Sequence, residues 1–342
     1  MTSSPKSMPE DLQTSMPSFR DVAAAAKRIH GLAVRTPLLE SPALNERVGG
    51  RVLLKAETLQ RTGSFKFRGA YNRISQIPES ARPAGVVACS SGNHAQGVAA
   101  AAAILGLPAT IIMPEDAPAM KLANTRAYGA EVITYPRDGG DREAMAAEIA
   151  TRRGATIVPP FDDAGVIAGQ GTCGLEIAEQ AAAMDAKLDA LLVCCGGGGL
   201  TAGCAIAMAE RSPETAVYTV EPEDFDDTRR SLASGERLTI AAGGRSICDA
   251  LLSPMPGRLT FAVNRALLAG GLAVSDAQVA DAMVYAFRTL KLVIEPGGAV
   301  ALAAVLSQRF DARGKTVAVV LSGGNVDPQM YAEIHTRHAG GG

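Results

Sequence analysis

The sequence predicts an α/β fold in which a mostly parallel sheet is covered by helices on both of its faces. Short runs of β-branched and aliphatic residues alternate with longer helical stretches along most of the chain. Apolar residues make up 47% of the composition and aromatic residues only 4%, so the core must consist largely of aliphatic side chains. Glycine accounts for 36 of the 342 residues, which favours helices packed closely on a sheet.

The elements follow in order from local patterns. Ser18 is a candidate N-cap for a helix over Val22–Ile29, and the first strand is predicted over Arg51–Leu54. Later strands are predicted over Val86–Cys89, Ala109–Met113, Glu131–Tyr135, Ala155–Val158, Leu191–Cys195, Ala216–Val220 and Thr316–Leu321. The helices between them are predicted over Ala95–Leu105, Met120–Tyr128, Arg142–Arg153, Gly171–Ala182 and Leu200–Arg211. Such alternation implies right-handed crossovers between parallel strands, so ligands are expected at the carboxyl ends of the strands.

The composition and the chain ends argue against several classes of protein. Lysine and arginine (33) nearly balance aspartate and glutamate (35), and a net charge of -2 argues against a nucleic-acid-binding protein. The most apolar run, Val98–Met113, is shorter than the ~20 residues of a membrane span, so no membrane partner is expected. Residues 1–15 are polar and are expected to form a disordered leader. The six cysteines lack zinc-binding spacing, which favours a reduced, cytoplasmic protein.

Two segments with chemistry-bearing residues lie in the first third of the chain. In Thr62–Ala70, Lys66 stands between Phe65 and Phe67. Taken alone, Lys66 fits a solvated lysine at the start of a helix as well as a reactive one. Ser90–His94 directly follows a predicted strand and opens an alanine-rich helix. Backbone amides at such a turn suit a carboxylate, although a plain turn and helix cap fits the same residues.

Two glycine-rich segments follow later strands. Gly196–Gly203 joins a strand to a helix, where a glycine backbone and a helix N-terminus favour a phosphate. It lacks the Lys-Ser/Thr of a P-loop, but it nearly satisfies the dinucleotide spacing, and Glu221 ends the next strand as a ribose-binding acid would. A nicotinamide enzyme is therefore an alternative. The second segment, Leu321–Asn325, follows the last strand and also fits an ordinary glycine-rich turn.

Taken together, these segments resemble the fold-type II pyridoxal-phosphate enzymes of the serine/threonine dehydratase and serine racemase group. The elements S-F-K-x-R-G-A, S-S-G-N-H, G-G-G-G-L and S-G-G-N occur in that family's order, and the resemblance covers Ser18 to Asp327. It implies a tryptophan-synthase-β-like fold with two open, mostly parallel, twisted sheets. A large domain would comprise residues 16–84 and 162–330, with a small domain inserted over 85–161 and a tail over 331–342.

The resemblance also implies a cofactor site for pyridoxal 5'-phosphate. Lys66 would form the internal Schiff base with the cofactor and later remove the Cα proton of the substrate. Phe65 and Phe67 would supply the desolvation that lowers the pKa of this lysine. The remaining cofactor contacts would come from Asn93 at the phenolic oxygen, Ser322 at the pyridine nitrogen, and Gly196, Gly197, Gly198, Gly199 and Leu200 at the phosphate.

The same resemblance implies a substrate site and a reaction. Ser90, Ser91, Asn93 and His94 match the loop that grips the substrate α-carboxylate, and Ser91 matches the racemase residue opposite the lysine. The implied reaction eliminates water from a β-hydroxy amino acid, giving a 2-oxo acid and ammonia. Arg142 matches an arginine near the substrate side chain, which favours 3-hydroxyaspartate.

The alternatives within this cofactor class are a serine or aspartate racemase and a β-replacement enzyme of the cysteine-synthase kind. The latter normally carries T-S-G-N and a different phosphate loop, so Ser90, Ser91 and the four glycines count against it.

Three further expectations come from the resemblance. Glu221, the Phe225 carbonyl and Asp227 match a cation loop whose oxygen ligands suit Mg²⁺, Mn²⁺ or Ca²⁺. A homodimer is expected. Two elements depart from the family pattern: A-D-G appears as Cys248-Asp249-Ala250, and E-P-S-G-A appears as Glu295-Pro296-Gly297-Gly298-Ala299. Both departures are expected to alter the shape near the substrate.

Overall fold

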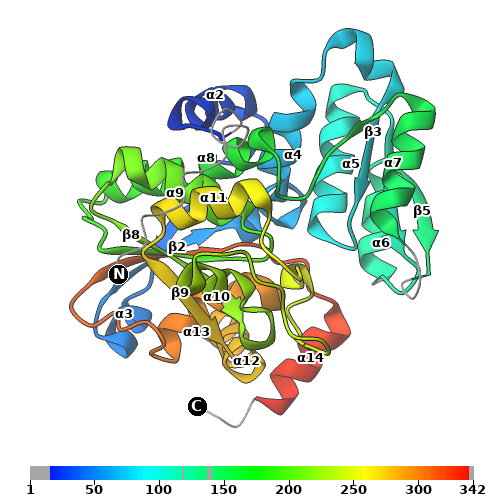
Figure 1. Ribbon diagram of the computed structural model, residues 1–342. Helices are drawn as coiled ribbons and strands as arrows, with labels where there is room; N and C mark the ends of the chain where they lie inside the picture. The colour runs from blue at the N-terminus through cyan, green and yellow to red at the C-terminus, as the bar shows by residue number, and fades with distance from the viewer. Residues whose placement is uncertain (1–15, 118, 137–140, 339–342) are drawn as a thin grey trace, which may run out of the picture.

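The computed structural model describes residues 16–117, 119–136 and 141–338. Within them the chain forms two sheets, each flanked by helices, and Figure 1 shows these as two lobes. The larger lobe contains strands β2, β8 and β9, and the smaller contains β3 and β5 with helices α5, α6 and α7. The predicted α/β fold with two mostly parallel sheets is confirmed.

The larger sheet has six strands in the order β1-β2-β10-β7-β8-β9. All neighbours are parallel except β1 and β2. Its strands are β1 (Leu38–Glu40), β2 (Arg51–Ala56), β7 (Ala190–Cys194), β8 (Ala216–Pro222), β9 (Gly270–Val274) and β10 (Thr316–Leu321). Because strands from both ends of the sequence pair here, residues far apart in the chain meet at the carboxyl ends of these strands.

Helices cover both faces of the larger sheet (Figure 1). One layer contains α2 (Phe19–Ile29), α8 (Ala164–Ala183), α9 (Gly199–Arg211) and α11 (Arg258–Leu267). The opposite layer contains α3 (Pro42–Val48), α12 (Asp276–Tyr285), α13 (Pro296–Leu306) and α14 (Pro328–Arg337), while α10 (Asp227–Ser234) packs on β8 and β9. Leucine, valine, isoleucine and alanine side chains fill the core between these layers. Their burial from water is the main stabilising contribution.

The smaller sheet has four parallel strands in the order β5-β4-β3-β6. The strands are β3 (Val86–Cys89), β4 (Ala109–Pro114), β5 (Glu131–Tyr135) and β6 (Thr156–Ile157). Its helices are α5 (Asn93–Leu105), α6 (Ala119–Ala127) and α7 (Arg142–Arg153). Helix α4 (Lys66–Ser75) packs against both α5 and α8, so it connects the two lobes.

Most predicted strands and helices lie within a few residues of the observed ones. Two short strands were missed: β1 has three residues, and β9 begins with Gly270 and Gly271, which carry no β-branched signal. Helix α14 crosses the expected start of the tail at residue 331. The expected leader, residues 1–15, lies outside the described residues.

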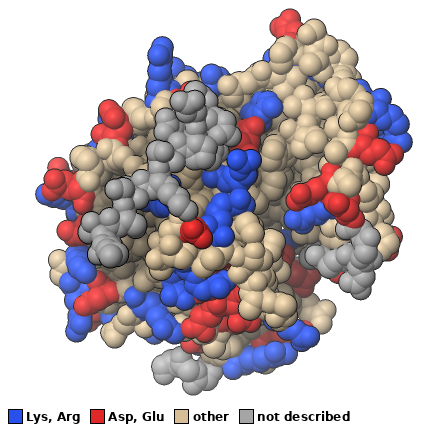
Figure 2. Space-filling model, in the orientation of Figure 1, with Lys and Arg blue, Asp and Glu red and all other residues tan. Residues whose placement is uncertain are grey.

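The surface and the cysteines show three further properties. Among the described residues, no helix is both long and apolar enough to span a bilayer. All six cysteines are free thiols. Acidic and basic side chains are interspersed over the face shown in Figure 2.

Candidate active site

Lys66 begins helix α4 shortly after the 3-10 turn Arg61–Gly63, which follows β2 and a first 3-10 turn, Glu57–Leu59. Thr62 and Gly63 have φ values of 66° and 71°, in the left-handed region, so the chain reverses sharply just before the lysine. The Lys66 Nζ donates to the Pro160 carbonyl at 2.8 Å and lies 5.2 Å from the centre of the Phe65 ring. Burial lowers the pKa of Lys66 to about 8. About a tenth of the Lys66 amine is therefore uncharged at pH 7, far more than for an exposed lysine, and only the uncharged amine acts as a nucleophile or base.

The segment Ser90–His94 joins β3 to α5 and faces the start of α4. Ser90 Oγ accepts from the Gly92 amide at 3.2 Å, which fixes the turn. His94 is 2% exposed, and burial lowers its pKa to about 3, so the imidazole is neutral. Since its Nε2 lies 2.9 Å from the Val158 carbonyl, Nε2 carries the proton and Nδ1 is an acceptor without a partner. The neutral His94 ring can accept a hydrogen bond from a donor group, but it does not bring a positive charge to an anion.

Asn93 is held on both sides of its amide group. Its Nδ2 donates to Glu295 Oε1 at 2.5 Å, and its Oδ1 accepts from Asn325 Nδ2 at 2.8 Å. Asn325 Nδ2 also donates to the Thr62 carbonyl at 2.8 Å. Three segments predicted from the sequence, around Lys66, Asn93 and Ser322, therefore converge.

The glycine loop forms the N-terminus of α9. Gly198 has a φ of 94°, and a Cβ on Gly197 would overlap the Phe161 ring, so larger residues do not fit. Thr260 Oγ1 donates to the Gly197 carbonyl at 2.6 Å and fixes the loop from α11. Because Phe161 follows Pro160, the partner of Lys66, the loop lies beside the lysine. A helix N-terminus with close-packed glycines is suited to a phosphate.

Ser322 follows β10 and is 4% exposed. Its carbonyl accepts from the Phe65 amide at 3.1 Å, and the next residue, Gly323, forms a β-bridge with Ser64. These backbone contacts hold Ser322 beside the start of α4, next to Lys66.

Arg142 lies apart from this cluster. It is the first residue of α7 and is exposed to solvent. Its carbonyl accepts from the Cys89 thiol at 3.1 Å, which places the start of α7 beside the end of β3, next to Ser90.

The predicted cation ligands lie between the end of β8, which contains Glu221, and the start of α10, which is Asp227. Glu221 is fully buried, and its two oxygens accept from the amides of Thr228 (3.0 Å) and Arg229 (2.7 Å). This use of both oxygens disfavours a ribose-binding role. Asp227 is 1% exposed, and neither of its carboxylate oxygens has a partner. Burial raises the pKa of Asp227 to about 7 and that of Glu221 well above its usual value.

A cation fits this pair of acids, because two buried carboxyl groups otherwise repel each other. Phe225 belongs to the 3-10 turn Glu223–Phe225 between them. Within the described ranges, no group of three or more His, Cys, Asp or Glu side chains could hold a metal, so the set would rest on two carboxylates and a carbonyl.

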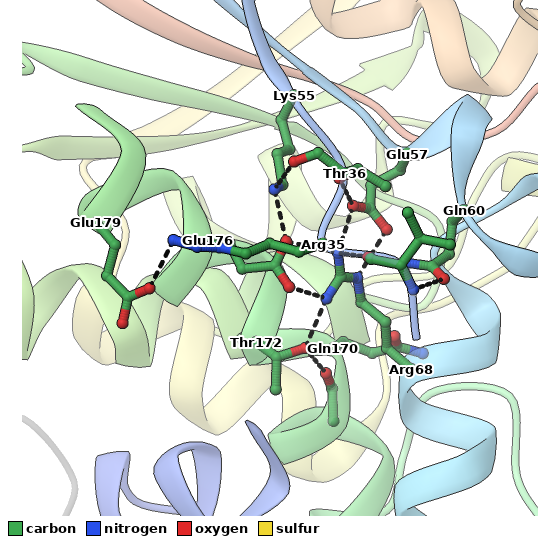
Figure 3. A network of polar contacts seen from close by, with 12 residues as sticks. Arg35, Thr36, Lys55, Glu57, Gln60, Arg68, Gln170, Thr172, Glu176 and Glu179 are labelled. Carbon is green, nitrogen blue, oxygen red and sulfur yellow. Dashed lines mark hydrogen bonds and ion pairs between the residues drawn. The ribbon is translucent and has the colours of Figure 1, made fainter. Parts of the chain in front are cut away.

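A buried ion network anchors the first turn of α4. Arg68 is fully buried and pairs with Glu57 (2.8 Å) and with Glu176 (2.7 Å), as Figure 3 shows. Lys55 joins the same network through Glu176 at 2.6 Å. The charges of Arg68 and Lys55 balance those of the two glutamates. Since Arg68 is two residues after Lys66, the network fixes the start of helix α4 to α8.

Several residues at this site were not found from the sequence as functional. Glu295 was noted only as part of a variant motif, although it contacts Asn93 directly. Lys121 Nζ pairs with Asp249 Oδ2 at 2.5 Å, and a Cβ on Gly92 would lie 3.4 Å from that Nζ. Glu295 and Asp249 lie in the two motifs that depart from the family pattern, whereas no sequence motif points to Lys121.

Comparisons with known proteins agree with this geometry. The sequence profile of the family "Pyridoxal-phosphate dependent enzyme" matches residues 29–323. An L-threo-3-hydroxyaspartate ammonia-lyase from a Pseudomonas species is 44% identical, over 93% of this chain and 98% of that protein. The serine racemase of Schizosaccharomyces pombe is 43% identical, over 93% of this chain and 97% of that protein. The crystal structure of the threonine deaminase from T.th. superposes with a TM-score of 0.86 at 46% identity, covering 91% of this chain and 99% of that one. The chain therefore belongs to the family of pyridoxal-phosphate dependent enzymes.

Proposed function

We propose that this enzyme is an amino-acid ammonia-lyase that eliminates water from a β-hydroxy-α-amino acid and releases a 2-oxo acid and ammonia. The observation that carries the proposal is Lys66, an amine of lowered pKa at the point where the segments of Asn93, Ser322 and the glycine loop meet. The curated relatives that are named ammonia-lyases support the reaction class.

Pyridoxal phosphate fits the residues present. Lys66 would carry the cofactor, the amides of Gly196 to Leu200 would hold its phosphate, and Asn93 and Ser322 would face its ring. When bound, the cofactor withdraws electrons from the substrate Cα and so weakens the bonds around it. Ser322 would favour elimination, because a hydroxyl placed at the ring nitrogen would stabilise ring protonation less than a carboxylate.

The chain's own residues would bind the substrate and move its proton. The Ser90–His94 turn would hold the α-carboxylate by hydrogen bonds, with the His94 ring neutral. Lys66 Nζ would take the proton from Cα on one face, and Ser91 would face the other side. The Lys66 amine suits this step because burial keeps its pKa near the working pH.

We infer 3-hydroxyaspartate as the preferred substrate. Arg142 lies next to the end of β3, and its guanidinium could pair with a second carboxylate. Coupled assays for 2-oxo acid and ammonia with serine, threonine and each 3-hydroxyaspartate stereoisomer test this substrate. Turnover of serine or threonine alone would contradict it.

Substitution tests the role of Arg142 directly. Arg142→Ala should lower kcat/KM for 3-hydroxyaspartate by about 10- to 100-fold, since a hydrogen bond to a charged group contributes ~1.5–3 kcal/mol. The kcat/KM values for serine and threonine should change by less than about twofold, the scale of a neutral surface substitution. Arg152→Ala, an exposed arginine of the same helix, is the control. Equal losses on all three substrates would contradict a discriminating role.

An amino-acid racemase is the second candidate. The 43% identical serine racemase favours it. In that reaction Ser91 would serve the face of Cα opposite Lys66. Chiral separation of serine and aspartate after incubation distinguishes the two activities. A racemisation rate above the elimination rate on every substrate would favour the racemase.

We propose further that Glu221, Asp227 and the Phe225 carbonyl bind a divalent cation. The two unpartnered oxygens of buried Asp227 support this site. Dialysis against a chelator should lower the melting temperature, and Mg²⁺, Mn²⁺ or Ca²⁺ should restore it. Asp227→Asn should abolish the response, whereas Glu223→Gln, an exposed neighbour, should retain it. A chelator without effect and no metal by elemental analysis would refute the site.

A homodimer is also proposed. Phe287 is 47% exposed and its ring contacts Tyr331 of α14, which also carries the exposed Met330. These side chains could be covered by a second copy. Light scattering should give a molar mass twice that of one chain, and Phe287→Glu should lower this measured mass.

The free thiols of the six cysteines support a reducing compartment such as the cytoplasm.

A further inference from the structure

Glu295 is a buried carboxylate at the centre of the site that the proposed reaction leaves without a role. It is 1% exposed and immediately precedes α13. Its amide donates to the Gly323 carbonyl at 3.0 Å, and its own carbonyl accepts from the Gly298 amide at 2.9 Å. The side chain does not cap α13. The backbone therefore holds Glu295 in place and leaves the carboxylate free for another task.

The carboxylate reaches Asn93 through space that only glycine leaves open. A Cβ on Gly323 would overlap Glu295 Oε1, so any larger residue at this position would displace the carboxylate. Oε1 accepts from Asn93 Nδ2 at 2.5 Å, while Oε2 has no hydrogen-bond partner. Burying a carboxylate oxygen without a partner is costly, so stability alone does not explain a glutamate at this position.

The contacts of Asn93 fix which way its amide points. Asn325 Nδ2 uses its two hydrogens on the Thr62 carbonyl and on Asn93 Oδ1. Asn93 Oδ1 must therefore be the acceptor, and Asn93 Nδ2 the donor to Glu295. One hydrogen of Asn93 Nδ2 remains for a further acceptor.

The surroundings of Glu295 contain charges of both signs. Burial raises the pKa of its carboxyl to about 7, and Asp249 adds to this effect. Lys121, Lys66 and the hydrogen bond from Asn93 oppose it. A carboxylate acceptor forms a stronger hydrogen bond than a neutral one, so the ionised form holds Asn93 more firmly.

We propose that Glu295 is a positioning residue that orients the Asn93 amide toward the phenolic oxygen of the bound cofactor. The inference rests on the proposed function, because it requires pyridoxal phosphate at Lys66. Glu295 acts through Asn93: without it, the Asn93 amide can rotate and its remaining hydrogen no longer has a fixed direction.

A double-mutant cycle on cofactor affinity tests this role. The dissociation constant of pyridoxal phosphate is measured by titrating the cofactor-free protein and following visible absorbance. Glu295→Ala should weaken binding by about tenfold, the change expected for loss of a hydrogen bond to a buried charged group. Glu295→Gln should stay within about threefold of the wild type, because its amide oxygen can still accept from Asn93.

The Asn93→Ala background makes the test specific. There, Glu295→Ala should weaken binding by less than about twofold, since neither residue retains its partner. Circular dichroism and thermal melting of each cofactor-free variant show whether it is folded. An unfolded Ala variant leaves the Gln variant to decide: a tenfold loss there contradicts the inference.

The failure of this inference can be told apart from the failure of the proposed function. If the wild type binds no pyridoxal phosphate at Lys66, the proposed function fails. If the wild type binds it and the effects of Glu295→Ala and Asn93→Ala multiply, only the positioning role is wrong.

Discussion

At the residue scale, the chemistry of the site depends on a lysine whose charge is opposed by its surroundings. Burial is the largest cause of the lowered pKa of Lys66, and the nearby Cys194 and Glu295 only partly offset it. An exposed lysine would be almost fully protonated at neutral pH. In the proposed role, Lys66 would gain its reactivity from its burial at the start of helix α4 and not from its residue type.

The Lys66 pKa leads to a prediction about cofactor loading. Because only the uncharged amine attacks an aldehyde, the rate of pyridoxal-phosphate incorporation into the cofactor-free protein should rise with pH. The midpoint should lie near 8, the value to which burial lowers this pKa. Stopped-flow absorbance from about pH 6 to 10 measures it, and Lys66→Ala is the control. A rate still rising steeply at the alkaline end of that range would contradict the lowered pKa.

Some of the site was predictable from residues and some was not. The segments of Lys66, Asn93, Ser322 and the glycine loop stand out because short chemical motifs follow strands, where parallel sheets place ligands. The part played by Glu295 was not predictable, since its partner Asn93 lies 202 residues away. The pair Lys121–Asp249 was missed for the same reason, because it joins residues 128 positions apart.

At the element scale, the two motifs that depart from the family pattern are in contact, at Gly297 and Ala250. A Cβ on Gly297 would lie 3.2 Å from the Ala250 Cβ and 3.2 Å from Leu251 Cγ. The family's motifs carry serine at the position of Gly297 and glycine at the position of Ala250. Here the methyl group of Ala250 lies next to Gly297, which lacks the serine side chain of the family's motif. We therefore expect the changes at positions 250 and 297 to compensate each other in volume.

This compensation predicts a double-mutant result. Gly297→Ser alone should destabilise the protein by about 1–3 kcal/mol, the usual cost of overpacking a core. Adding Ala250→Gly should recover most of that loss, because it removes the methyl that the serine would meet. Urea denaturation of the wild type, the two single variants and the double variant measures these free energies of unfolding. Additive effects of the two substitutions would show that the positions are independent.

The elements themselves were predicted best where the pattern was strong. Strands β3, β5 and β10 were predicted with their observed bounds, since runs of valine and isoleucine between turn residues are unambiguous. Strand β9 was not predicted, because its pairing with β8 comes from tertiary context and not from Gly270 and Gly271.

At the scale of the whole molecule, the site lies between two lobes that helix α4 and a polar contact connect. Lys121 of α6 belongs to the smaller lobe, and Asp249 lies in the 3-10 turn Asp249–Leu251, which packs against α13 of the larger one. Lys121 is 4% exposed at its side chain and Asp249 is 41% exposed. This ion pair crosses between the lobes beside Gly92 and so couples their positions to the Ser90–His94 turn.

Removing one partner should loosen the contact between the lobes. Asp249→Asn should lower the free energy of unfolding by about 1–2 kcal/mol, less than for a fully buried pair because Asp249 is partly solvated. Amide hydrogen exchange of α6 should also become faster. Adding Lys121→Met should restore part of the stability, since no buried charge is then left unpaired. Unchanged exchange in α6 would contradict a role for this pair in holding the lobes together.

The proposed function depends on one lysine, Lys66, carrying the cofactor. The purified enzyme is reduced with borohydride, digested and analysed by mass spectrometry. We expect the cofactor's added mass on the peptide that contains Lys66, and no visible absorbance in Lys66→Ala. A label on Lys55, Lys121 or any other lysine, or no label at all, would contradict it.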